Sequence, residues 1–110
     1  MSMLDGIFRI ESVSRSPERQ AEVDAETSRL TLYHFEVCPF CRRVRAAIER
    51  LALNIELRDT RRDPGAYREL LEGGGRTMVP CLRIDHGHGQ VEWMYESTDI
   101  VAYLNRRFGE

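Results

Sequence analysis

Apolar and polar positions alternate along residues 30–36, a segment rich in strand-forming residues, and this pattern predicts a β-strand. The apolar residues that follow recur at the spacing of one helical face, and this helix is expected to end near Ala52. The face comprises Phe40, Val44, Ala47, Ile48 and Leu51. Residues 55–58 then predict a second strand, and the strand–helix–strand order implies a right-handed parallel crossover.

The rest of the chain predicts two more helices and a pair of strands. Asp63 followed by Pro64 is typical of a helix start, and three glycines at residues 73–75 are expected to end this helix after Leu71. Two strands follow, at residues 81–85 and 90–95, and residues 86–89 form the hairpin loop between them. A final helix begins near Ser97 or Thr98 and is closed by Gly109. Its apolar face comprises Ile100, Val101, Leu104 and Phe108. The order βαβαββα predicts an α/β fold with one mixed four-stranded sheet and helices on both faces.

The first 29 residues differ in pattern from the rest and are predicted to be an N-terminal leader to a domain at residues 30–110. Ser16 followed by Pro17 is typical of a capped helix start, which predicts a short acidic helix over residues 17–27. This helix has few apolar residues to bury, so we expect it to be mobile or bound to a partner.

The composition describes one small globular domain. The chain has 110 residues, of which 42% are hydrophobic and 31% charged. Its formal net charge of −2 argues against nucleic-acid binding, and it contains neither a signal peptide nor an apolar run long enough for a membrane span. Three cysteines are too few for a secreted disulfide scaffold and cannot all pair within one chain, so we expect a reducing, cytoplasmic location.

A Cys-Pro-Phe-Cys motif at residues 38–41 opens the first helix of the domain. A cysteine at a helix start meets unsatisfied backbone N–H groups and the positive end of the helix dipole, and both stabilise a thiolate. Arginines at positions 42, 43 and 45 add positive charge, so we expect Cys38 to be a nucleophile at neutral pH. Cys41 lies one turn further along the same helix face, within reach of a disulfide with Cys38, and is predicted to be the resolving thiol.

The same C-x-x-C spacing also occurs in zinc sites, which usually need a second pair of ligands. Only Cys81 and three scattered histidines are available for that purpose. We therefore favour redox chemistry and expect no metal. Cys81 itself is predicted to be a buried apolar residue, with a role as an alternative resolving thiol left open.

The Val79-Pro80 pair lies between a glycine-rich segment and a predicted strand. This is a favoured place for a cis peptide bond, although a trans proline at a sheet edge would fit the segment alone. Beside the cysteine pair we favour the cis form. A turn of this kind next to a cysteine can pair through the backbone of Val79 with an extended peptide substrate.

The strand, the Cys-Pro-Phe-Cys helix start and the Val-Pro pair before a hairpin together resemble the thioredoxin fold, and in particular the glutaredoxins, over residues 30–108. Glu96-Ser97 in addition resembles the glutathione transferase N-terminal domain. The resemblance implies glutathione-dependent thiol–disulfide exchange, in which Cys38 takes up glutathione and either free glutathione or Cys41 resolves the mixed disulfide. It also implies that the Val79 backbone and Pro80 hold the cysteinyl part of glutathione.

The resemblance further implies where the two ends of glutathione bind. The γ-glutamyl end is expected at Glu96, Ser97, Thr98 and Asp99. There a hydroxyl and the first N–H groups of the last helix would hold the carboxylate, and Glu96 or Asp99 would pair with the amine. A plain helix cap is the alternative interpretation of these residues. Many glutaredoxins bind the glycine carboxylate through a lysine where this chain has Phe35, and Arg76 is the expected substitute.

The predicted function is that of a monomeric, glutathione-dependent dithiol oxidoreductase. Its partners would be glutathione and proteins with disulfides or glutathione adducts, not nucleic acid or membrane. One alternative is a dimeric [2Fe–2S] cluster carrier bound through Cys38 and glutathione, which Pro39 is thought to disfavour. Another is a non-catalytic glutathione-binding or docking module.

Overall fold

The structure, a computed structural model, describes residues 13–109. The predicted order of elements is confirmed, with a helix before the βαβαββα pattern. The elements are α2 (Pro17–Thr27), β1 (Leu30–His34), α3 (Pro39–Arg50), β2 (Glu56–Asp59), α4 (Pro64–Glu69), η1 (Leu70–Gly74), β3 (Cys81–Gly87), β4 (Gln90–Met94) and α5 (Ser97–Phe108). None of the helices in this part of the chain has the length and apolar character needed to cross a membrane.

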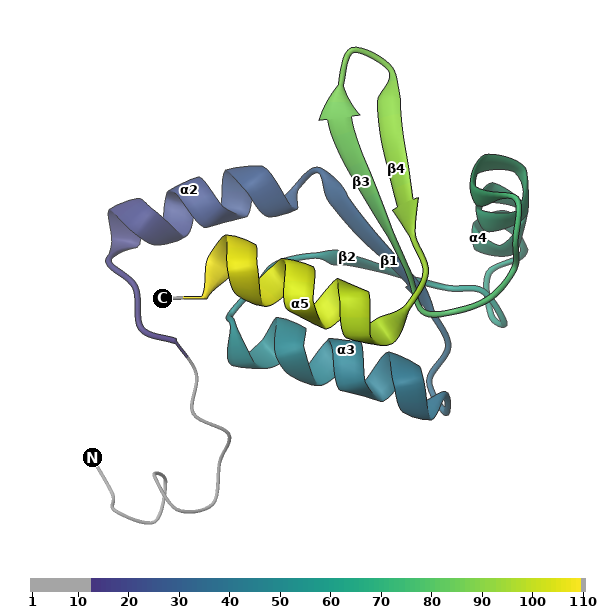
Figure 1. The fold of residues 1–110 in the computed structure, drawn as a ribbon, viewed down its shortest axis with the longest axis horizontal. Helices are drawn as coiled ribbons and strands as arrows, with labels where there is room; N and C mark the ends of the chain where they lie inside the picture. Colours follow the sequence, from purple (N-terminus) through teal and green to yellow (C-terminus); the bar gives the residue numbers. More distant parts are fainter. Residues whose placement is uncertain (1–12, 110) are drawn as a thin grey trace.

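The four strands form one mixed sheet in the order β2-β1-β3-β4. Strand β1 pairs in parallel with β2 and antiparallel with β3, and β3 pairs antiparallel with β4. Figure 1 shows α3 and α5 lying side by side, with α4 separate from them at the other side of the sheet. The parallel pairing of β1 with β2 confirms that the connection through α3 is a parallel crossover.

Alternate residues of the central strands supply two separate hydrophobic clusters, which confirms helices on both faces of the sheet. Leu32 of β1 and Leu82 of β3 belong to the larger cluster, with the apolar faces of α3 and α5. The smaller cluster contains Tyr33, which follows Leu32 in β1, and Cys81, which precedes Leu82 in β3, together with residues of α4 and η1. Successive residues of a strand point to opposite faces, so this division follows from the strand period of two.

Helix α2 has the predicted bounds, with the Ser16 hydroxyl accepting from the backbone N–H of Arg19 as its N-cap. Despite its few apolar residues, the helix packs on the body of the protein. Val23 and Thr27 are fully buried, and Val23 belongs to the larger hydrophobic cluster. The remainder of the predicted leader, residues 1–12, lies outside the described residues.

A second set of contacts joins α2 and the residues before it to the ends of two other helices. The Arg15 guanidinium donates to the carbonyl of Phe108 at the end of α5 (2.8 Å) and to the carbonyl of Ala52 just after α3 (3.5 Å). Asn54 donates to the carboxylate of Asp24 on α2 (2.9 Å). The N-terminal segment therefore braces the C-terminal ends of α3 and α5.

The predicted helix from Asp63 differs from the structure in its second half. The α-helix ends at Glu69, and a π-helical turn, η1, continues to Gly74. At Gly73 an added Cβ would lie 2.2 Å from the ring of Trp93, so a wide turn of glycines lets the backbone pass close to an aromatic side chain. Gly75, in the left-handed region (φ 84°), ends the turn.

Two other predictions also need correction. Strand β3 continues to Gly87, past the expected loop start, and His88 (φ 55°) and Gly89 (φ 76°) make the turn, so His86 lies in the strand and contacts Glu92 at 2.9 Å. Phe40, expected on the buried face of its helix, is 57% exposed. The first turn of α3 extends past the start of α5 (Figure 1). The buried face of α3 therefore begins one turn later than the helical spacing of apolar residues predicts.

Candidate active site

The two cysteines of the motif lie at the start of α3, as predicted. Cys38 is the N-cap residue, and its sulfur accepts a hydrogen bond from the backbone N–H of Cys41 at 3.4 Å. Cys38 is 7% exposed and Cys41 is fully buried, and both are free thiols. The N-cap sulfur therefore occupies the place where a helix stabilises negative charge.

Burial distinguishes Cys41 chemically. Its burial, together with a side-chain hydrogen bond to Cys38, raises the pKa of the Cys41 thiol to about 12. A group with this pKa stays protonated at neutral pH. Cys41 is thus a thiol that must lose its proton before it can attack a disulfide.

Arg45 fastens the loop that carries Cys38. From α3 its guanidinium reaches back to the ring Nδ1 of His34 (2.9 Å) and to the carbonyls of Phe35 (3.3 Å) and Glu36 (2.8 Å). Burial, and then the charge of Arg45, lower the pKa of His34, which favours a neutral imidazole that accepts from the arginine. The sequence predicted Arg45 only as a positive charge near Cys38. In the structure its hydrogen bonds also hold residues 34–36, which lead into the cysteine motif, in place.

A cavity of about 280 Å³ lies beside the start of α3. It is formed where three segments meet: the first turn of α3, the residues before β3, and the junction of β4 with α5. The Val79–Pro80 peptide bond is cis, which confirms the prediction. The cavity is lined by Phe40, Arg43, Met78, Val79, Pro80, Tyr95, Glu96, Ser97 and Thr98.

The structure brings most of the predicted glutathione-binding residues together in this cavity: Val79, Pro80, Glu96, Ser97 and Thr98. Two others lie beside it. The Arg76 guanidinium lies 4.3 Å over the ring of Tyr95, which lines the cavity, and Asp99 is exposed in the first turn of α5. Cys38 and Cys41 are not among the lining residues, but Cys38 precedes the helical turn that contributes Phe40.

The start of α5 has no side-chain cap. Glu96 is the N-cap residue and makes no side-chain capping bond, and Ser97 is already the first helical residue. The interpretation of residues 97–99 as a plain cap is therefore wrong. The first N–H groups of a helix without a cap attract anions, and here they adjoin the cavity.

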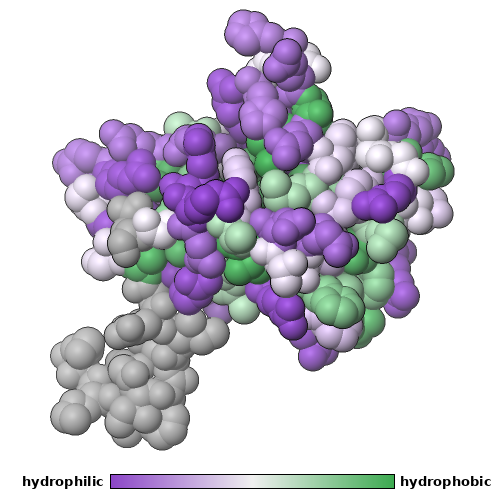
Figure 2. Space-filling model, in the orientation of Figure 1, coloured by the Kyte–Doolittle hydropathy of each residue, from purple (hydrophilic) through white to green (hydrophobic). Residues whose placement is uncertain are grey.

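Sequence reasoning missed several residues of the cavity. The sequence pattern predicts a buried position for Phe40 and gives no binding role to Tyr95, Met78 or Arg43. Their signals were positional, since Met78 directly precedes the Val-Pro pair and Tyr95 directly precedes Glu96. Val37, Phe40 and Met78 are exposed apolar residues, and Figure 2 shows hydrophobic surface (green) gathered at the lower right, where α3 begins.

Cys81 is fully buried next to Tyr33, Ala66 and Leu70, which confirms the prediction of a buried residue. Burial raises the pKa of its thiol to about 12. Within residues 13–109, no group of three or more His, Cys, Asp or Glu side chains is arranged to hold a metal ion.

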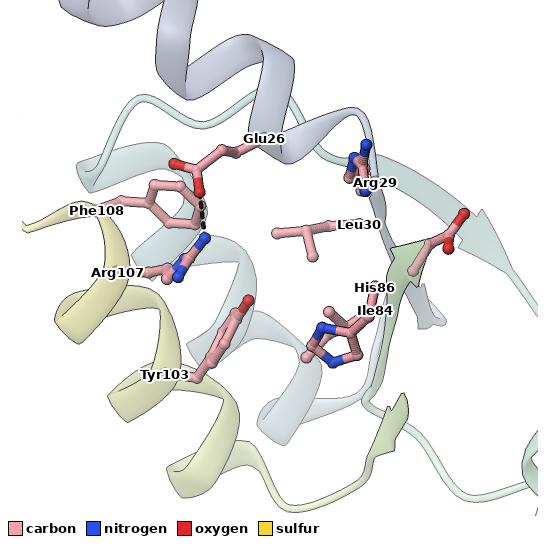
Figure 3. Close-up of a pocket in the computed structure, with 9 residues that line it drawn as sticks. Glu26, Arg29, Leu30, Ile84, His86, Tyr103, Arg107 and Phe108 are labelled. Atoms are coloured by element: carbon pink, nitrogen blue, oxygen red, sulfur yellow. Dashed lines mark hydrogen bonds and ion pairs between the residues drawn. The ribbon is translucent and has the colours of Figure 1, made fainter. Parts of the chain in front are cut away.

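A second hollow, of about 220 Å³, lies between α2, β1, β3 and α5 (Figure 3). Glu26 and Arg107 form an ion pair at one side of it, beside Phe108, and the Leu30 and Tyr103 side chains point toward its centre. No residue of the Cys-Pro-Phe-Cys motif lines it, whereas Phe40 of that motif lines the cavity beside α3, so the latter is the candidate for thiol chemistry.

Comparison with known proteins identifies the family. Residues 32–110 match the family described as glutathione S-transferase, N-terminal domain. No curated protein matches the chain.

Several solved structures share the fold. Glutathione transferase Omega 2C from Trametes versicolor is 22% identical over 73% of this chain, with a TM-score of 0.60. Maleylacetoacetate isomerase from Anaeromyxobacter dehalogenans 2CP-1, solved with glutathione in its active site, is 25% identical over 74% (TM-score 0.56). Glutathione S-transferase E7 from Drosophila melanogaster is 30% identical over 74% (TM-score 0.57).

The matched region covers 38%, 38% and 35% of those three chains, so this chain spans little more than a third of their length. The family match, by contrast, extends over most of the present chain and includes both cysteines of the motif, the cis-proline turn and the start of α5. The chain therefore belongs to the glutathione S-transferase N-terminal domain family and has a thioredoxin-like fold.

Proposed function

We propose that this chain is a glutathione-dependent dithiol oxidoreductase of the glutaredoxin type, which reduces protein disulfides and glutathione mixed disulfides. One observation carries the proposal: Cys38 is the N-cap of α3, and Cys41 lies one helical turn after it. The first turn of this helix borders a cavity that is also lined by the cis-proline turn at Val79-Pro80 and by the start of α5, which has no side-chain cap. A transferase that only activates the thiol of glutathione has no need of a second protein thiol within reach of the first.

Glutathione fits the three sides of this cavity. The α-carboxylate of its γ-glutamyl end would accept from the first N–H groups of α5 and from the hydroxyl of Ser97 or Thr98, with Glu96 or Asp99 near the amine. The backbone of Val79 would pair with the cysteinyl residue, as an added strand does. A maleylacetoacetate isomerase with the same fold holds glutathione in its active site, which supports this assignment.

The first step would be attack by the Cys38 thiolate on the glutathionyl sulfur of a mixed disulfide. The S–S bond of the substrate breaks, the target protein leaves as a thiolate and takes a proton from water, and a Cys38–glutathione disulfide forms. No net oxidation has occurred at this stage, because one disulfide has replaced another.

The second step can follow two routes. A glutathione thiolate attacks the glutathionyl sulfur, which releases oxidised glutathione and the Cys38 thiolate. Alternatively, Cys41 loses its proton and attacks the sulfur of Cys38, which forms the Cys38–Cys41 disulfide and expels glutathione as a thiolate that takes up the proton. Two further glutathiones would then reduce the Cys38–Cys41 disulfide.

A coupled assay tests the proposal. The chain is given a glutathionylated peptide with glutathione, glutathione reductase and NADPH, and NADPH consumption is followed. We expect turnover by the wild-type chain and none by Cys38→Ser, since serine cannot form the mixed disulfide. No turnover by the wild-type chain, or equal turnover by Cys38→Ser, would overturn the proposal.

The proposed setting is a reducing, cytoplasmic one, in which the chain acts as a monomer. Three cysteines are too few for a secreted disulfide scaffold, which supports a reducing setting. Size-exclusion chromatography with light scattering tests the oligomeric state.

A further inference from the structure

Tyr95 makes two contacts with a single neighbour, Arg76. Its hydroxyl donates to the backbone carbonyl of Arg76 at 3.0 Å, and its ring lies 4.3 Å below the Arg76 guanidinium. The two residues come from different segments, since Arg76 follows the glycine run and Tyr95 follows β4. Tyr95 therefore ties the loop before the cis-proline to the start of α5.

The position of the Tyr95 hydroxyl is itself restricted. A Cβ added at Gly74 would lie 2.0 Å from it, so the π-helical turn of η1 comes close to the aromatic ring. Burial, followed by the nearby Cys81 thiol, raises the pKa of Tyr95, so the hydroxyl remains a hydrogen-bond donor at neutral pH. Tyr95 also lines the cavity, together with Val79 and Ser97.

We propose that Tyr95 is a positioning residue, which holds the exposed Arg76 guanidinium where it can pair with the glycine carboxylate of glutathione. This inference rests on the proposed function, because it names a binding determinant of the same cavity. It goes beyond the expectation for Arg76, since it assigns to Tyr95 the role of fixing both the backbone and the side chain of that arginine.

The reason for such a device lies in the chain just before Arg76. The turn η1 and Gly75 end just before Arg76, which is exposed, and a long exposed side chain loses much conformational freedom when a ligand binds it. A guanidinium already stacked on an aromatic ring, with its backbone carbonyl hydrogen-bonded, has less freedom to lose. Removal of the Tyr95 hydroxyl should therefore weaken glutathione binding by about fivefold, as loss of one hydrogen bond does.

The test compares glutathione with γ-glutamylcysteine, which lacks the glycine. Binding is measured by titration calorimetry with Cys38→Ser protein, so that no thiol exchange with Cys38 occurs. Into this background are placed Tyr95→Phe, Arg76→Ala and both together. We expect each single change to weaken glutathione binding about fivefold or more, with no change for γ-glutamylcysteine and no additional loss for Tyr95→Phe once Arg76 is absent.

Tyr67→Phe is the matched control, because this tyrosine is exposed on α4 and is not among the residues lining the cavity. Thermal melting verifies that each variant is folded. Equal weakening of both ligands by Tyr95→Phe, or no weakening of either, would overturn the inference while leaving the oxidoreductase intact. Absence of both glutathione binding and turnover in the wild-type assay would overturn the proposed function, and the inference with it.

Discussion

The backbone N–H of Cys41 donates to the sulfur of Cys38 at 3.4 Å, so one helical turn both brings the two thiols together and stabilises negative charge on the first. The second thiol is held as a neutral group by its burial. The two cysteines of the motif are therefore chemically unequal.

This inequality predicts different effects of the two serine substitutions. Cys38→Ser should abolish both activities, whereas Cys41→Ser should keep the reduction of a glutathionylated peptide, because free glutathione can resolve that adduct. Cys41→Ser should lose reduction of a protein disulfide that requires two protein thiols. The coupled NADPH assay with each substrate measures both activities.

Cys81→Ala is the control for these substitutions, since it removes a buried thiol that the proposed two-step reaction does not use. It should keep both activities. Equal losses in Cys38→Ser and Cys41→Ser on the glutathionylated peptide would contradict the division of roles.

The buried thiols predict a loss of stability at alkaline pH. Cys41 and Cys81 have pKa values raised to about 12 in the folded chain, against about 8.5 for an unfolded cysteine. Below about pH 8.5 both states keep the proton, but above it only the unfolded state releases it. The free energy of unfolding should then fall with rising pH, by up to about 1.4 kcal/mol per pH unit for each thiol.

Urea unfolding at pH 7, 8, 9 and 10 in the presence of a reductant measures this slope. The Cys81→Ala variant is measured in the same way, because it lacks one of the two titrating thiols. Only its pH slope is compared with that of the wild-type chain, so a lower stability of the variant at pH 7 does not affect the comparison. Its slope above pH 9 should be shallower than that of the wild-type chain. An identical slope in both proteins would show that burial does not hold the Cys81 proton.

Ser97 separates ligand binding from helix capping. It lies in the cavity and is the first residue of α5, whose N-cap position makes no side-chain bond. Ser97→Ala should weaken glutathione binding by about five- to tenfold with little change in melting temperature. Calorimetry and thermal melting measure the two effects, and Ser14→Ala, at an exposed position before α2, is the matched change. A loss of about 1 kcal/mol in stability without a loss of affinity would instead show that the hydroxyl has a structural role and no part in binding.

The N-terminal brace predicts an effect on stability from a residue outside the matched family region. Arg15 donates to carbonyls at the ends of two helices, where a positive charge is favoured by both dipoles. Arg15→Ala should lower the free energy of unfolding by about 1–3 kcal/mol. Arg68→Ala, on the exposed side of α4, should change it by less than about 0.5 kcal/mol. Similar losses in the two variants, measured by urea unfolding, would show that the brace contributes no stability.

Local sequence signals were sufficient wherever the interaction itself is local. Ser16, Cys38 and Asp63 each precede a proline, and each is the N-cap of the helix that was predicted. Capping depends on residues within three or four positions of one another, and strand alternation depends on neighbours two apart. The order of elements and both motif cysteines could therefore be predicted without knowledge of the fold.

Errors arose where distant segments meet. The π-helical turn brings Gly73 and Gly74 against Trp93 in β4 and Tyr95 just after it, which lie about twenty residues further along the chain. Phe40 matched the helical spacing of buried residues, yet it is exposed because its turn extends past the neighbouring helix. Periodicity describes a face of an element but not what lies opposite that face.

The sequence by itself determined which residues are the candidates for thiol chemistry: two cysteines one helical turn apart, and a Val-Pro pair before a strand. The tertiary structure alone decided that the Val-Pro turn, the start of α5 and the first turn of α3 border one cavity, that Cys41 is fully buried, and that Tyr95 contacts Arg76. The reason is that burial and contact depend on how the sheet and its helices pack, which nearest-neighbour patterns do not encode.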